Sequence, residues 1–473
     1  MKKTKIICTL GPACDDLSMM EKMLNAGMDA ARFNFSHGSH KEHLRRLDRF
    51  RQVRDALGVS AATILDTKGP EIRIGRVKND RMFLTENQKF CLSCDSCIAD
   101  DSEVTVSYKN LYREISCGDQ LLIDDGKIRL EAEDIQDKTI VCRVVSGGYI
   151  SSNKSINIPG VHLNFRYLTG KDKQDILFGI QNGFDYIAAS FVRSARDVMD
   201  IKKFLSENGG DNIKIISKIE SRDGIDNFRE ILLASDGIMI ARGDMGVEIE
   251  YSRLPGIQKK IIRRCNECGK IVITATQMLE SMVDNLLPTR AEITDIANAV
   301  FDGTSAVMLS GESAAGKHPA EAVASMAKII RQAEYDMCTA NFSTSAVSLS
   351  DLNNVSNAIG HAACTTARDI SASALLALTT SGYTAQKMSK FRPCQPIFAA
   401  TSSQHTYHRM SLFWGVSPLL VQRSSSYELM YNTALKQIKK IIPLKTGDYI
   451  VTSAGFPLNI EGNTNMIRVE VIK

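Results

Sequence analysis

The stretch IKIISKIESRDGIDNFREILLASDGIMIARGD, which spans residues 213–244, decides the fold class. It contains two short apolar runs, at 213–219 and 238–241, separated by a helical segment. Apolar runs of this length indicate strands that are buried on both faces. Each run then breaks into charge, reaching Glu220 in the first case and Asp244 in the second. Because an unpaired buried carboxylate is costly, both acids should face water, a cation or a ligand.

The same strand-then-helix unit recurs through residues 1–340. Eight such pairs can be read from the sequence, which is the number that closes a (β/α)8 TIM barrel. The pairs could also be divided between open sheets, but a closed α/β barrel is the fold that we expect. The expected strands cover residues 5–10, 30–35, 62–65, 186–191, 213–219, 238–241, 271–276 and 306–309.

Residues 69–165 interrupt this alternation. The segment is rich in β-branched residues and in Gly-containing turns, as in EVTVSY and QLLIDDGKI, and its helical periodicity is weak. It predicts a small β-barrel lid domain that is inserted after the third barrel strand and placed on the rim. The barrel catalytic domain then comprises residues 1–68 and 166–340.

A segment rich in Ser, Asn and Thr at 341–354 resembles a linker, and the alternation of strands and helices resumes beyond it. We expect a C-terminal three-layer α/β domain over residues 350–473, which offers ligand sites beyond its strand ends. Its expected strands cover 375–378, 397–400, 417–421, 449–452 and 466–471, and its helices include 357–369 and 427–441.

The composition excludes several classes of protein. The chain has 473 residues, of which 44% are hydrophobic and 24% charged, and a formal net charge of +4. These proportions are ordinary for a globular protein, and the charge is too small to indicate nucleic-acid binding. No apolar stretch approaches the ~18 residues of a membrane-spanning helix. The N-terminal sequence MKKTKIICTLGP indicates a strand rather than a signal peptide, so we expect a cytoplasmic protein with neither nucleic acid nor membrane as a partner.

Twelve cysteines raise the question of a metal site. Cys91, Cys94 and Cys97 have CxxCxxC spacing, and Cys265 and Cys268 have CxxC spacing, as in some iron–sulfur or zinc sites. No clear fourth ligand lies near the first group, and no second CxxC follows the other at zinc-ribbon spacing. We therefore favour reduced cysteines that serve as small hydrophobic or surface residues.

Charged and hydroxyl residues follow the predicted strands on one side of the barrel. The carboxyl ends of parallel barrel strands meet at one rim, where active sites lie. A single strand-end acid is most often a helix cap, but a whole rim of such residues favours a site. Cations beside carboxylates that can hold a hard divalent metal suit phosphoryl transfer. The cations are Arg32, Arg73 and Lys218, the acids are Glu220 and Asp244, and a second group of oxygens is Asn34, Ser36, Asp66 and Thr67.

Several long motifs are similar to those of one enzyme family. They are ARFNFSHG (31–38), LDTKGPEIR (65–73), SKIE (217–220), MIARGDMGVE (239–248), ITATQMLESM (273–282), PTRAE (288–292) and DGTSAVMLSGESAAGKHP (302–319). Together they resemble pyruvate kinase, of the bacterial type without an extra C-terminal domain, over nearly the whole chain. The resemblance implies a cytoplasmic, homotetrameric enzyme of glycolysis. Such an enzyme transfers the phosphoryl group of phosphoenolpyruvate to ADP and yields ATP and pyruvate through a metal-stabilised enolate.

The resemblance also implies a role for each matching residue. The catalytic residues would be Arg32, Lys218 and Thr276. Phosphoenolpyruvate would contact Arg32, Lys218, Gly243, Asp244 and Thr276. Mg²⁺ or Mn²⁺ would be held by Glu220 and Asp244, and K⁺ by Asn34, Ser36, Asp66 and Thr67. The nucleotide would face Asn34, His37, Arg73 and Lys154. An acid at the position of Glu71 accompanies potassium dependence in this family.

The turn after residue 378 implies a further site, since hydroxyls and backbone N–H groups there can cradle a phosphate. A Ser/Thr-capped helix explains the same residues equally well. The resemblance favours a sugar-phosphate effector, such as fructose 1,6-bisphosphate. The residues concerned are Thr379, Thr380, Ser381, Gly382 and Thr384.

Three other functions compete with this interpretation. Residues 311–317 fit the start of a phosphate-binding P-loop, but His318 stands where Ser or Thr is needed. A metal-dependent aldolase-type enolate enzyme would share the rim acids but would need no potassium cluster and no ADP. A decayed, non-catalytic scaffold is disfavoured because the rim is complete. Phe33, Met245 and Ser155 depart from the usual motifs, and Ser155 brings the role of Lys154 into question.

Overall fold

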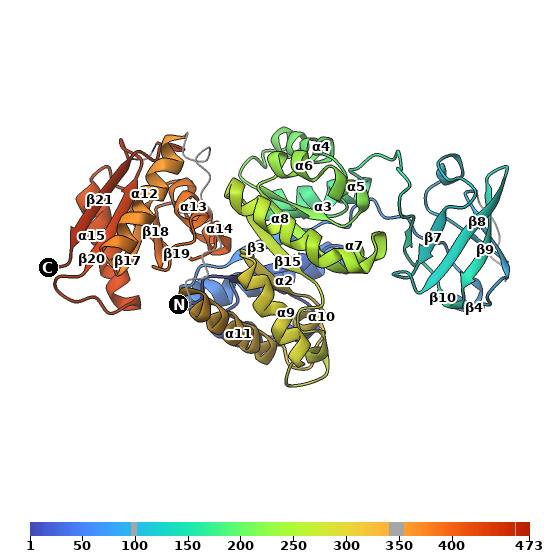
Figure 1. Ribbon diagram of the computed structural model, residues 1–473, viewed down its shortest axis with the longest axis horizontal. Helices are drawn as coiled ribbons and strands as arrows, with labels where there is room; N and C mark the ends of the chain where they lie inside the picture. Colours follow the sequence, from blue (N-terminus) through green and yellow to red (C-terminus); the bar gives the residue numbers. More distant parts are fainter. Residues whose placement is uncertain (96–101, 340–353, 459) are drawn as a thin grey trace.

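Three domains lie in a row in the computed structural model, which describes residues 1–95, 102–339, 354–458 and 460–473. A helix-covered barrel is in the centre, a β-rich inserted domain stands on one side of it, and the C-terminal domain packs on the other (Figure 1). Both chain termini lie on the side away from the inserted domain. This arrangement confirms the predicted fold class, while the exact domain boundaries stay a prediction.

The central sheet is a closed barrel of parallel strands in the order β1-β16-β15-β14-β13-β12-β3-β2. All eight expected strands are present, and their burial explains why they read as near-continuous apolar runs. The strands are β1 (Lys5–Thr9), β2 (Ala30–Asn34), β3 (Ala62–Asp66), β12 (Tyr186–Ala189), β13 (Lys214–Ile219), β14 (Gly237–Ala241), β15 (Ile271–Ala275) and β16 (Ala306–Leu309).

Helices surround the barrel, and local sequence signals fix where several of them begin. Ser39 and Glu42 form a capping box at one helix start, and Thr289 and Glu292 form another. The surrounding helices are α1 (Leu17–Ala26), α2 (His40–Leu57), α3 (Gly170–Gln181), α4 (Ala195–Glu207), α6 (Phe228–Ala234), α8 (Leu254–Cys268), α9 (Arg290–Phe301) and α11 (Pro319–Thr339). Short helices at the rim are α5 (Arg222–Asp226), α7 (Arg242–Glu248) and α10 (Gly311–Ala314).

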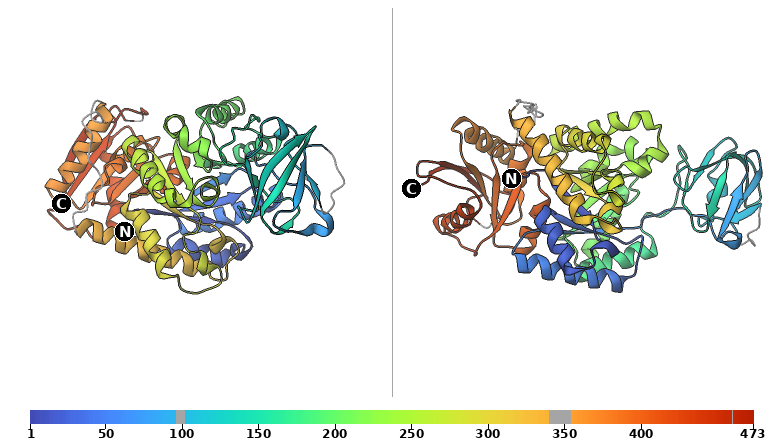
Figure 2. Two further views of the ribbon diagram at one scale, coloured as in Figure 1. Left: turned by 45° about the vertical axis from the view of Figure 1, so that its right-hand side comes forward. Right: turned by 90° about the horizontal axis from the view of Figure 1, so that it is seen from below.

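The inserted domain has a core of its own and is joined to the barrel by two chain segments (Figure 2). Its strands are divided between a six-stranded sheet, β11-β7-β8-β9-β5-β6, and a two-stranded sheet, β10-β4, that share this core. The strands are β4 (Arg81–Leu84), β5 (Lys89–Ser93), β6 (Glu103–Thr105), β7 (Gln120–Ile123), β8 (Ile128–Gln136), β9 (Thr139–Ser146), β10 (Gly148–Ser151) and β11 (Ile156–Asn157).

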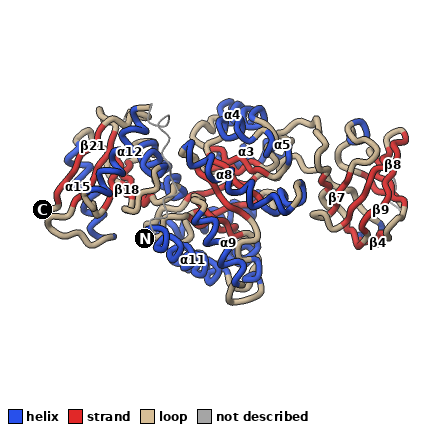
Figure 3. The backbone as a smooth tube through the Cα atoms, viewed as in Figure 1, coloured by secondary structure: helices blue, strands red, loops and turns tan. Residues whose placement is uncertain are grey.

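The C-terminal domain is a sheet between two helical layers (Figure 3). The strand order is β19-β18-β17-β20-β21, and the last strand pairs antiparallel to its neighbour. Helices α12 and α13 pack on one face and α15 packs on the other. The elements are α12 (Val355–Asp369), β17 (Ala374–Leu378), α13 (Tyr383–Lys390), β18 (Ile397–Thr401), α14 (Gln404–Arg409), β19 (Val416–Leu420), α15 (Tyr427–Ile441), β20 (Tyr449–Ala454) and β21 (Met466–Val471).

Two sequence features fall partly outside the described residues. Cys97 of the CxxCxxC group lies outside the described residues, and Asn354 is the one residue of the predicted linker that lies within them. Cys94 and Cys265 are buried, whereas Cys268 is exposed. Among the described residues, no helix is both long and apolar enough to cross a membrane.

The C-terminal domain packs against the amino-terminal ends of the barrel strands. Lys5, which opens β1, donates a 2.7 Å hydrogen bond to the carbonyl of Val416. Tyr186, which opens β12, donates its hydroxyl at 2.9 Å to the carbonyl of Arg409. The opposite ends of the strands therefore remain available for the inserted domain and for a site.

His408 is a buried imidazole at this domain junction. Neither of its ring nitrogens has a hydrogen-bond partner in the described part of the chain. Its pKa is lowered to about 4, mainly by burial; the charges of Arg54 and Arg51 on α2 act in the same direction, and Asp55 opposes them. Because an unfolded histidine titrates near 6.5, the unfolded chain binds more protons between these values.

We therefore expect the junction to lose stability as the pH falls from 6.5 towards 4. Between pH 7 and pH 5, His408 should lower the free energy of unfolding by about 1–2 kcal/mol. The loss is measured from the urea midpoints of unfolding at both pH values. The wild type is compared with His408→Phe and with His162→Phe, a control at an exposed histidine. The His408 variant should show the smaller acid loss, and equal losses in all three proteins contradict the assignment.

Candidate active site

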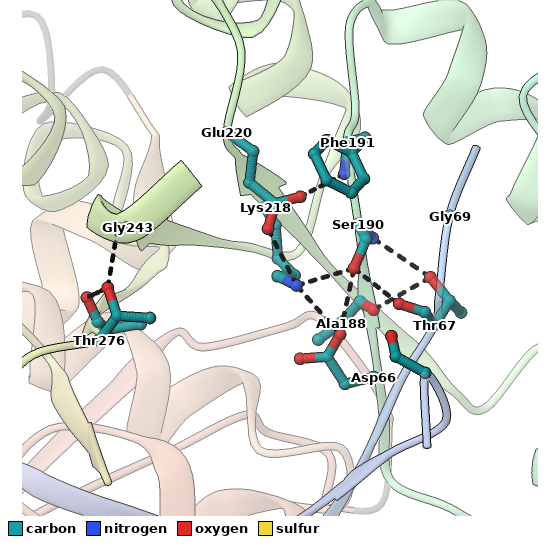
Figure 4. Close-up of polar contacts among 12 residues, drawn as sticks. Asp66, Thr67, Gly69, Ala188, Ser190, Phe191, Lys218, Glu220, Gly243 and Thr276 are labelled. Carbon is teal, nitrogen blue, oxygen red and sulfur yellow. Dashed lines mark hydrogen bonds and ion pairs between the residues drawn. The ribbon is translucent and has the colours of Figure 1, made fainter. Parts of the chain in front are cut away.

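A buried lysine lies at the centre of the rim. Lys218 is the penultimate residue of β13, and its Nζ is 3.1 Å from Asp66 Oδ1 and 3.0 Å from Glu220 Oε1 (Figure 4). It also donates a 2.7 Å hydrogen bond to Ser190 Oγ. These residues meet because β12 pairs with both β3 and β13, so that the ends of three adjacent strands converge. The rim thus brings together side chains that are far apart in the sequence.

Two cations share the carboxylate of Asp66. Arg32 Nε binds Asp66 Oδ2 at 2.6 Å, and the same arginine donates from Nη1 to Thr9 Oγ1 at 2.9 Å. Burial alone would raise the pKa of Asp66, but Arg32 and Lys218 bring it below its usual value. Burial alone would lower the pKa of Lys218, but Asp66 and Glu220 raise it above its usual range. Lys218 is therefore an ammonium and Asp66 a carboxylate at neutral pH.

Glu220 and Asp244 form the pair of acids that was expected to hold a divalent metal. Glu220 is buried and accepts a short hydrogen bond from the backbone N–H of Phe191. Asp244 lies in the first turn of α7, directly after β14, which pairs with β13. Burial raises the pKa of Glu220 to about 7, Lys218 opposes this shift, and the charge of Asp244 adds to it.

The chemistry of these donors fits Mg²⁺ or Mn²⁺. Carboxylate oxygens are the ligands that hard divalent cations prefer, and the raised pKa of Glu220 marks a place where further positive charge is stabilising. In the described ranges, no three Asp, Glu, His or Cys side chains gather as a complete metal cage. Two protein carboxylates therefore leave coordination positions for water and substrate oxygens.

Thr276 lies at the end of β15 in a turn with unusual backbone angles. Its φ is +67° and that of Gln277 is +53°, a region that costs a residue with a side chain on the order of 1–3 kcal/mol. Thr276 Oγ1 accepts from the backbone N–H of Gly243 at 3.0 Å (Figure 4). Arg242 binds the carbonyls of Thr276 and Gln277 at 2.6 and 3.3 Å and the carboxylate of Asp295 at 2.7 Å. This arginine therefore holds the strained turn beside Gly243 and Asp244.

The last residue of β2 and the loop that follows it carry three predicted site residues. Asn34 Oδ1 accepts from the backbone N–H of Ser36 at 3.1 Å, and His37 is exposed. The loop is fixed from outside by Lys171, which donates to the carbonyl of Phe35 at 2.8 Å, and by His43, whose Nε2 lies 2.8 Å from the carbonyl of His37. Asn34 and Asp66 are paired in the β2–β3 register, so the loop lies next to the Lys218 cluster. The hydroxyl of Thr67 accepts from the Ser190 N–H at 3.2 Å.

The remaining predicted residues lie in the inserted domain or beside it. Arg73 is 2.6 Å from Glu71, and Lys154 is 2.8 Å from Asp124. A cavity of about 400 Å³ separates the inserted domain from the rim, and its lining includes Glu71 and Asp244. Arg73 and Lys154 are not among its lining residues, so in this arrangement both cations are engaged with partners of their own.

The predicted effector residues lie around the start of α13, remote from the rim. Thr379 Oγ1 accepts from the N–H of Gly382 at 3.0 Å, and Thr384 Oγ1 lies 2.8 Å from Thr464 Oγ1. A small pocket is lined by Thr379, Thr380, Ser381 and Thr384 together with residues 460–463. These groups are brought together, and Gly382 supplies the turn that precedes the helix.

Comparison with known proteins gives a consistent result. The family described as pyruvate kinase, barrel domain, matches residues 1–323, and the pyruvate kinase alpha/beta domain matches residues 357–470. A pyruvate kinase from Clostridium acetobutylicum is 44% identical, with complete coverage of both chains. One from Sporosarcina psychrophila is also 44% identical, and the match covers 81% of it. A crystal structure of a pyruvate kinase from Cryptosporidium parvum superimposes with a TM-score of 0.92 at 35% identity, covering 99% of this chain and 96% of that one.

The chain belongs to the pyruvate kinase family.

Membership of the pyruvate kinase family disfavours the competing functions. The P-loop-like segment does not form an open loop: Gly311–Ala314 is a short helix. The buried Glu312 accepts hydrogen bonds from the backbone N–H groups of Leu279 and Ser310 at 3.0 and 2.7 Å. Lys317 is exposed and pairs with Asp284 at 2.9 Å. The motif therefore stabilises the end of β16 through the buried carboxylate of Glu312.

Sequence reasoning missed several residues of the pyruvate kinase rim. The expected strand at 186–191 ran too far: β12 ends at Ala189, so Ser190 and Phe191 lie on the rim and contact Lys218 and Glu220. A hydroxyl at the end of an apolar run was the available signal. Arg242 is part of a family motif, but the sequence alone assigned it no role.

Two residues that depart from the usual family motifs are accommodated in the core. Phe33 packs edge-to-face on Phe184, and Met245 is buried.

Gly69 is another missed residue, at the exit from β3 towards the inserted domain. Its φ is +71°, and a Cβ atom there would lie 2.9 Å from the carbonyl oxygen of Ser190. Its N–H donates to Asp172 at 3.0 Å. A side chain at this position would therefore displace the residue that binds Lys218.

Arg242 gives a test of the strained turn. Lysine keeps the charge but cannot contact two carbonyls and a carboxylate with one fork, so Arg242→Lys should let Thr276 relax. We expect the KM for phosphoenolpyruvate to rise about tenfold, with a smaller change in kcat. Asp295→Asn, which spares the contacts to the two carbonyls, should have a weaker effect. An unchanged KM in Arg242→Lys contradicts the positioning role.

Proposed function

We propose that the barrel rim is the active site of this chain and that Lys218 is its central catalytic residue. The chain is a phosphotransferase of glycolysis that transfers the phosphoryl group of phosphoenolpyruvate to ADP and forms ATP and pyruvate. The observation that carries the assignment of the site is the position of the Lys218 ammonium, 3.0 Å from Glu220, with Asp244 at the end of the neighbouring strand.

Glu220 and Asp244 would hold Mg²⁺ or Mn²⁺. When bound, the divalent ion supplies positive charge to the phosphate and to the oxygen of the departing group. The two carboxylates come from adjacent strand ends, and burial of Glu220 disfavours its negative charge unless a cation is near. Glu220→Gln should raise the Mn²⁺ concentration that is needed for half-maximal activity. An unchanged Mn²⁺ requirement contradicts this assignment.

Lys218 would neutralise the transferring phosphoryl group and the enolate oxygen that develops behind it. The β-phosphate oxygen of ADP forms a bond to phosphorus while the bond from phosphorus to the enolate oxygen breaks. The charge of Lys218 is fixed in advance by Asp66, Glu220 and Ser190, so little reorganisation is needed as the reaction proceeds. Arg32, which is held by the same Asp66, would also contact the phosphate.

Thr276 and the backbone at Gly243 would bind the carboxylate of phosphoenolpyruvate. The Gly243 N–H already points at Thr276 Oγ1, and a carboxylate oxygen is a stronger acceptor than a hydroxyl. After phosphoryl transfer the enolate gains a proton at carbon. We assign Thr276, together with water, to relay this proton. A loss of solvent-proton exchange into pyruvate in Thr276→Val, at retained pyruvate binding, tests the relay.

The finer features rest on the family resemblance together with the placement of the residues. K⁺ would bind among Asn34, Ser36, Asp66 and Thr67, and the nucleotide would approach Asn34, His37, Arg73 and Lys154 once the inserted domain moves.

A sugar phosphate would bind at Thr379–Thr384 and change the cooperativity of phosphoenolpyruvate saturation. Saturation curves with and without the effector measure this change. We further propose a homotetramer in the cytoplasm, which light scattering and cell fractionation check.

Replacing the central lysine tests its catalytic role. Lys218→Met removes the cation at the reacting centre, so kcat for ADP-dependent pyruvate formation should fall by about 10³ or more. Because Asp66 and Glu220 lose their shared partner, some loss of Tm is also expected. The matched control is Lys317→Met, an exposed lysine near the end of β16, which should keep full activity. Near-normal turnover in Lys218→Met would falsify the assignment.

The monovalent cation requirement is tested separately. With Glu71 acidic, we expect activity in KCl and little activity in choline chloride at equal ionic strength. Glu71 pairs with Arg73, and a lysine in its place brings a fixed positive charge to this region. Glu71→Lys should therefore retain activity without K⁺, whereas Glu71→Gln should not. Full wild-type activity in choline chloride rejects the potassium site.

A further inference from the structure

Two cysteines from different domains face each other at the surface. Cys338 lies near the end of α11, the last barrel helix, and Cys394 lies in the connection between α13 and β18 of the C-terminal domain. Their Sγ atoms are 2.8 Å apart, and both residues are exposed and free. They are separated by 56 residues in the sequence. This juxtaposition has no role in the phosphoryl-transfer site, which lies at the other end of the barrel.

The distance between the two sulfurs favours a covalent link. A disulfide joins sulfurs at about 2.05 Å, so a movement of less than about 1 Å brings these two into bonding distance. Because both thiols are exposed, a small oxidant can reach them directly.

Lys3 fixes both sides of the pair. Its Nζ donates to the carbonyls of Pro393 and Cys394 at 3.1 and 2.7 Å, and it lies 3.8 Å from Cys338 Sγ. Its backbone N–H donates to Glu334 on α11 at 2.9 Å. One residue thus ties the helix that carries Cys338 to the loop that carries Cys394. Burial and the contact with Cys338 raise the pKa of Cys394, and the ammonium of Lys3 opposes this shift by placing positive charge beside the sulfurs.

We propose that Cys338 and Cys394 form an oxidant-sensitive modification site that links the barrel to the C-terminal domain. A peroxide oxidises one thiol to a sulfenic acid: a sulfur–oxygen bond forms, the oxygen–oxygen bond breaks, and one water leaves. The second thiol attacks this sulfur, the sulfur–sulfur bond forms, and the hydroxyl leaves as a second water. The two cysteines lose two electrons and two protons in total, and the peroxide is reduced to two waters.

The link falls beside the contacts that join the two domains. Arg392, two residues before Cys394, donates to Asn266 Oδ1 and to the Gly303 carbonyl at 2.8 and 2.9 Å, and its guanidinium lies 4.5 Å from the ring of Trp414. A bond at Cys394 therefore restrains a region that is already packed on the barrel. Oxidation limits separation of the domains and leaves turnover at saturating substrate unchanged, because the rim is at the opposite strand ends.

The site is tested on the full-length protein, first reduced and then treated with hydrogen peroxide. Remaining thiols are alkylated, and tryptic peptides are analysed by mass spectrometry without reduction. The expected product is a cross-linked pair of peptides containing Cys338 and Cys394, which dithiothreitol reverses. It should be absent in C338S and in C394S, and present in the control C117S, which removes an exposed cysteine of the inserted domain.

A second measurement reports the effect on the folded protein. Peroxide should raise the apparent Tm by about 2 °C or more in the wild type and in C117S, and leave it unchanged in C338S and C394S. Separate alkylation of both cysteines after peroxide, a single cysteine converted to sulfinic acid, or a disulfide between two chains would each overturn the proposal. Equal activity of C338S and the wild type before oxidation shows that any failure lies in this site and not in the active site.

Discussion

The ammonium of Lys218, buried between two carboxylates, is the interaction on which the rim depends. An unpaired charge at this depth is costly, and so is either acid without its partner. Asp66 therefore has to end β3 and Glu220 has to follow β13, with Ser190 beyond the strand between them. The closed parallel barrel provides this geometry, because it places the carboxyl ends of all its strands in one plane. Fold and chemistry are linked through this single cluster.

The other half of the rim depends on a strained turn of the backbone. Thr276 and Gln277 occupy a backbone region that residues with side chains disfavour, and Arg242 holds their carbonyls from behind. Asp295 in α9 holds the arginine in turn. The position of the Thr276 hydroxyl thus depends on a helix that is outside the strand ends. Preorganisation of this kind is stabilised by packing elsewhere in the domain.

The sequence was sufficient to predict the barrel strands because buried parallel strands are near-continuous apolar runs. It also predicted the acids and cations that end them, since these break the runs visibly. Ser190 was hidden because a hydroxyl can belong to the end of a strand, and only the observed end of β12 at Ala189 places it on the rim. The partners of Arg73 and Lys154 could not be predicted, since they depend on how the inserted domain folds. The Cys338–Cys394 contact joins distant residues without any spacing motif.

The attachment of the C-terminal domain to the starts of the barrel strands limits how it can influence the chemistry. A five-residue strand such as β1 spans roughly 16 Å, so the two ends of the barrel are separated by about that length. A charged molecule bound near Thr384 would lie beyond the strand starts, and its Coulomb interaction with Lys218 at the opposite ends weakens with that distance. An influence of such a molecule on the rim would therefore be carried mainly by small axial displacements of stiff strands.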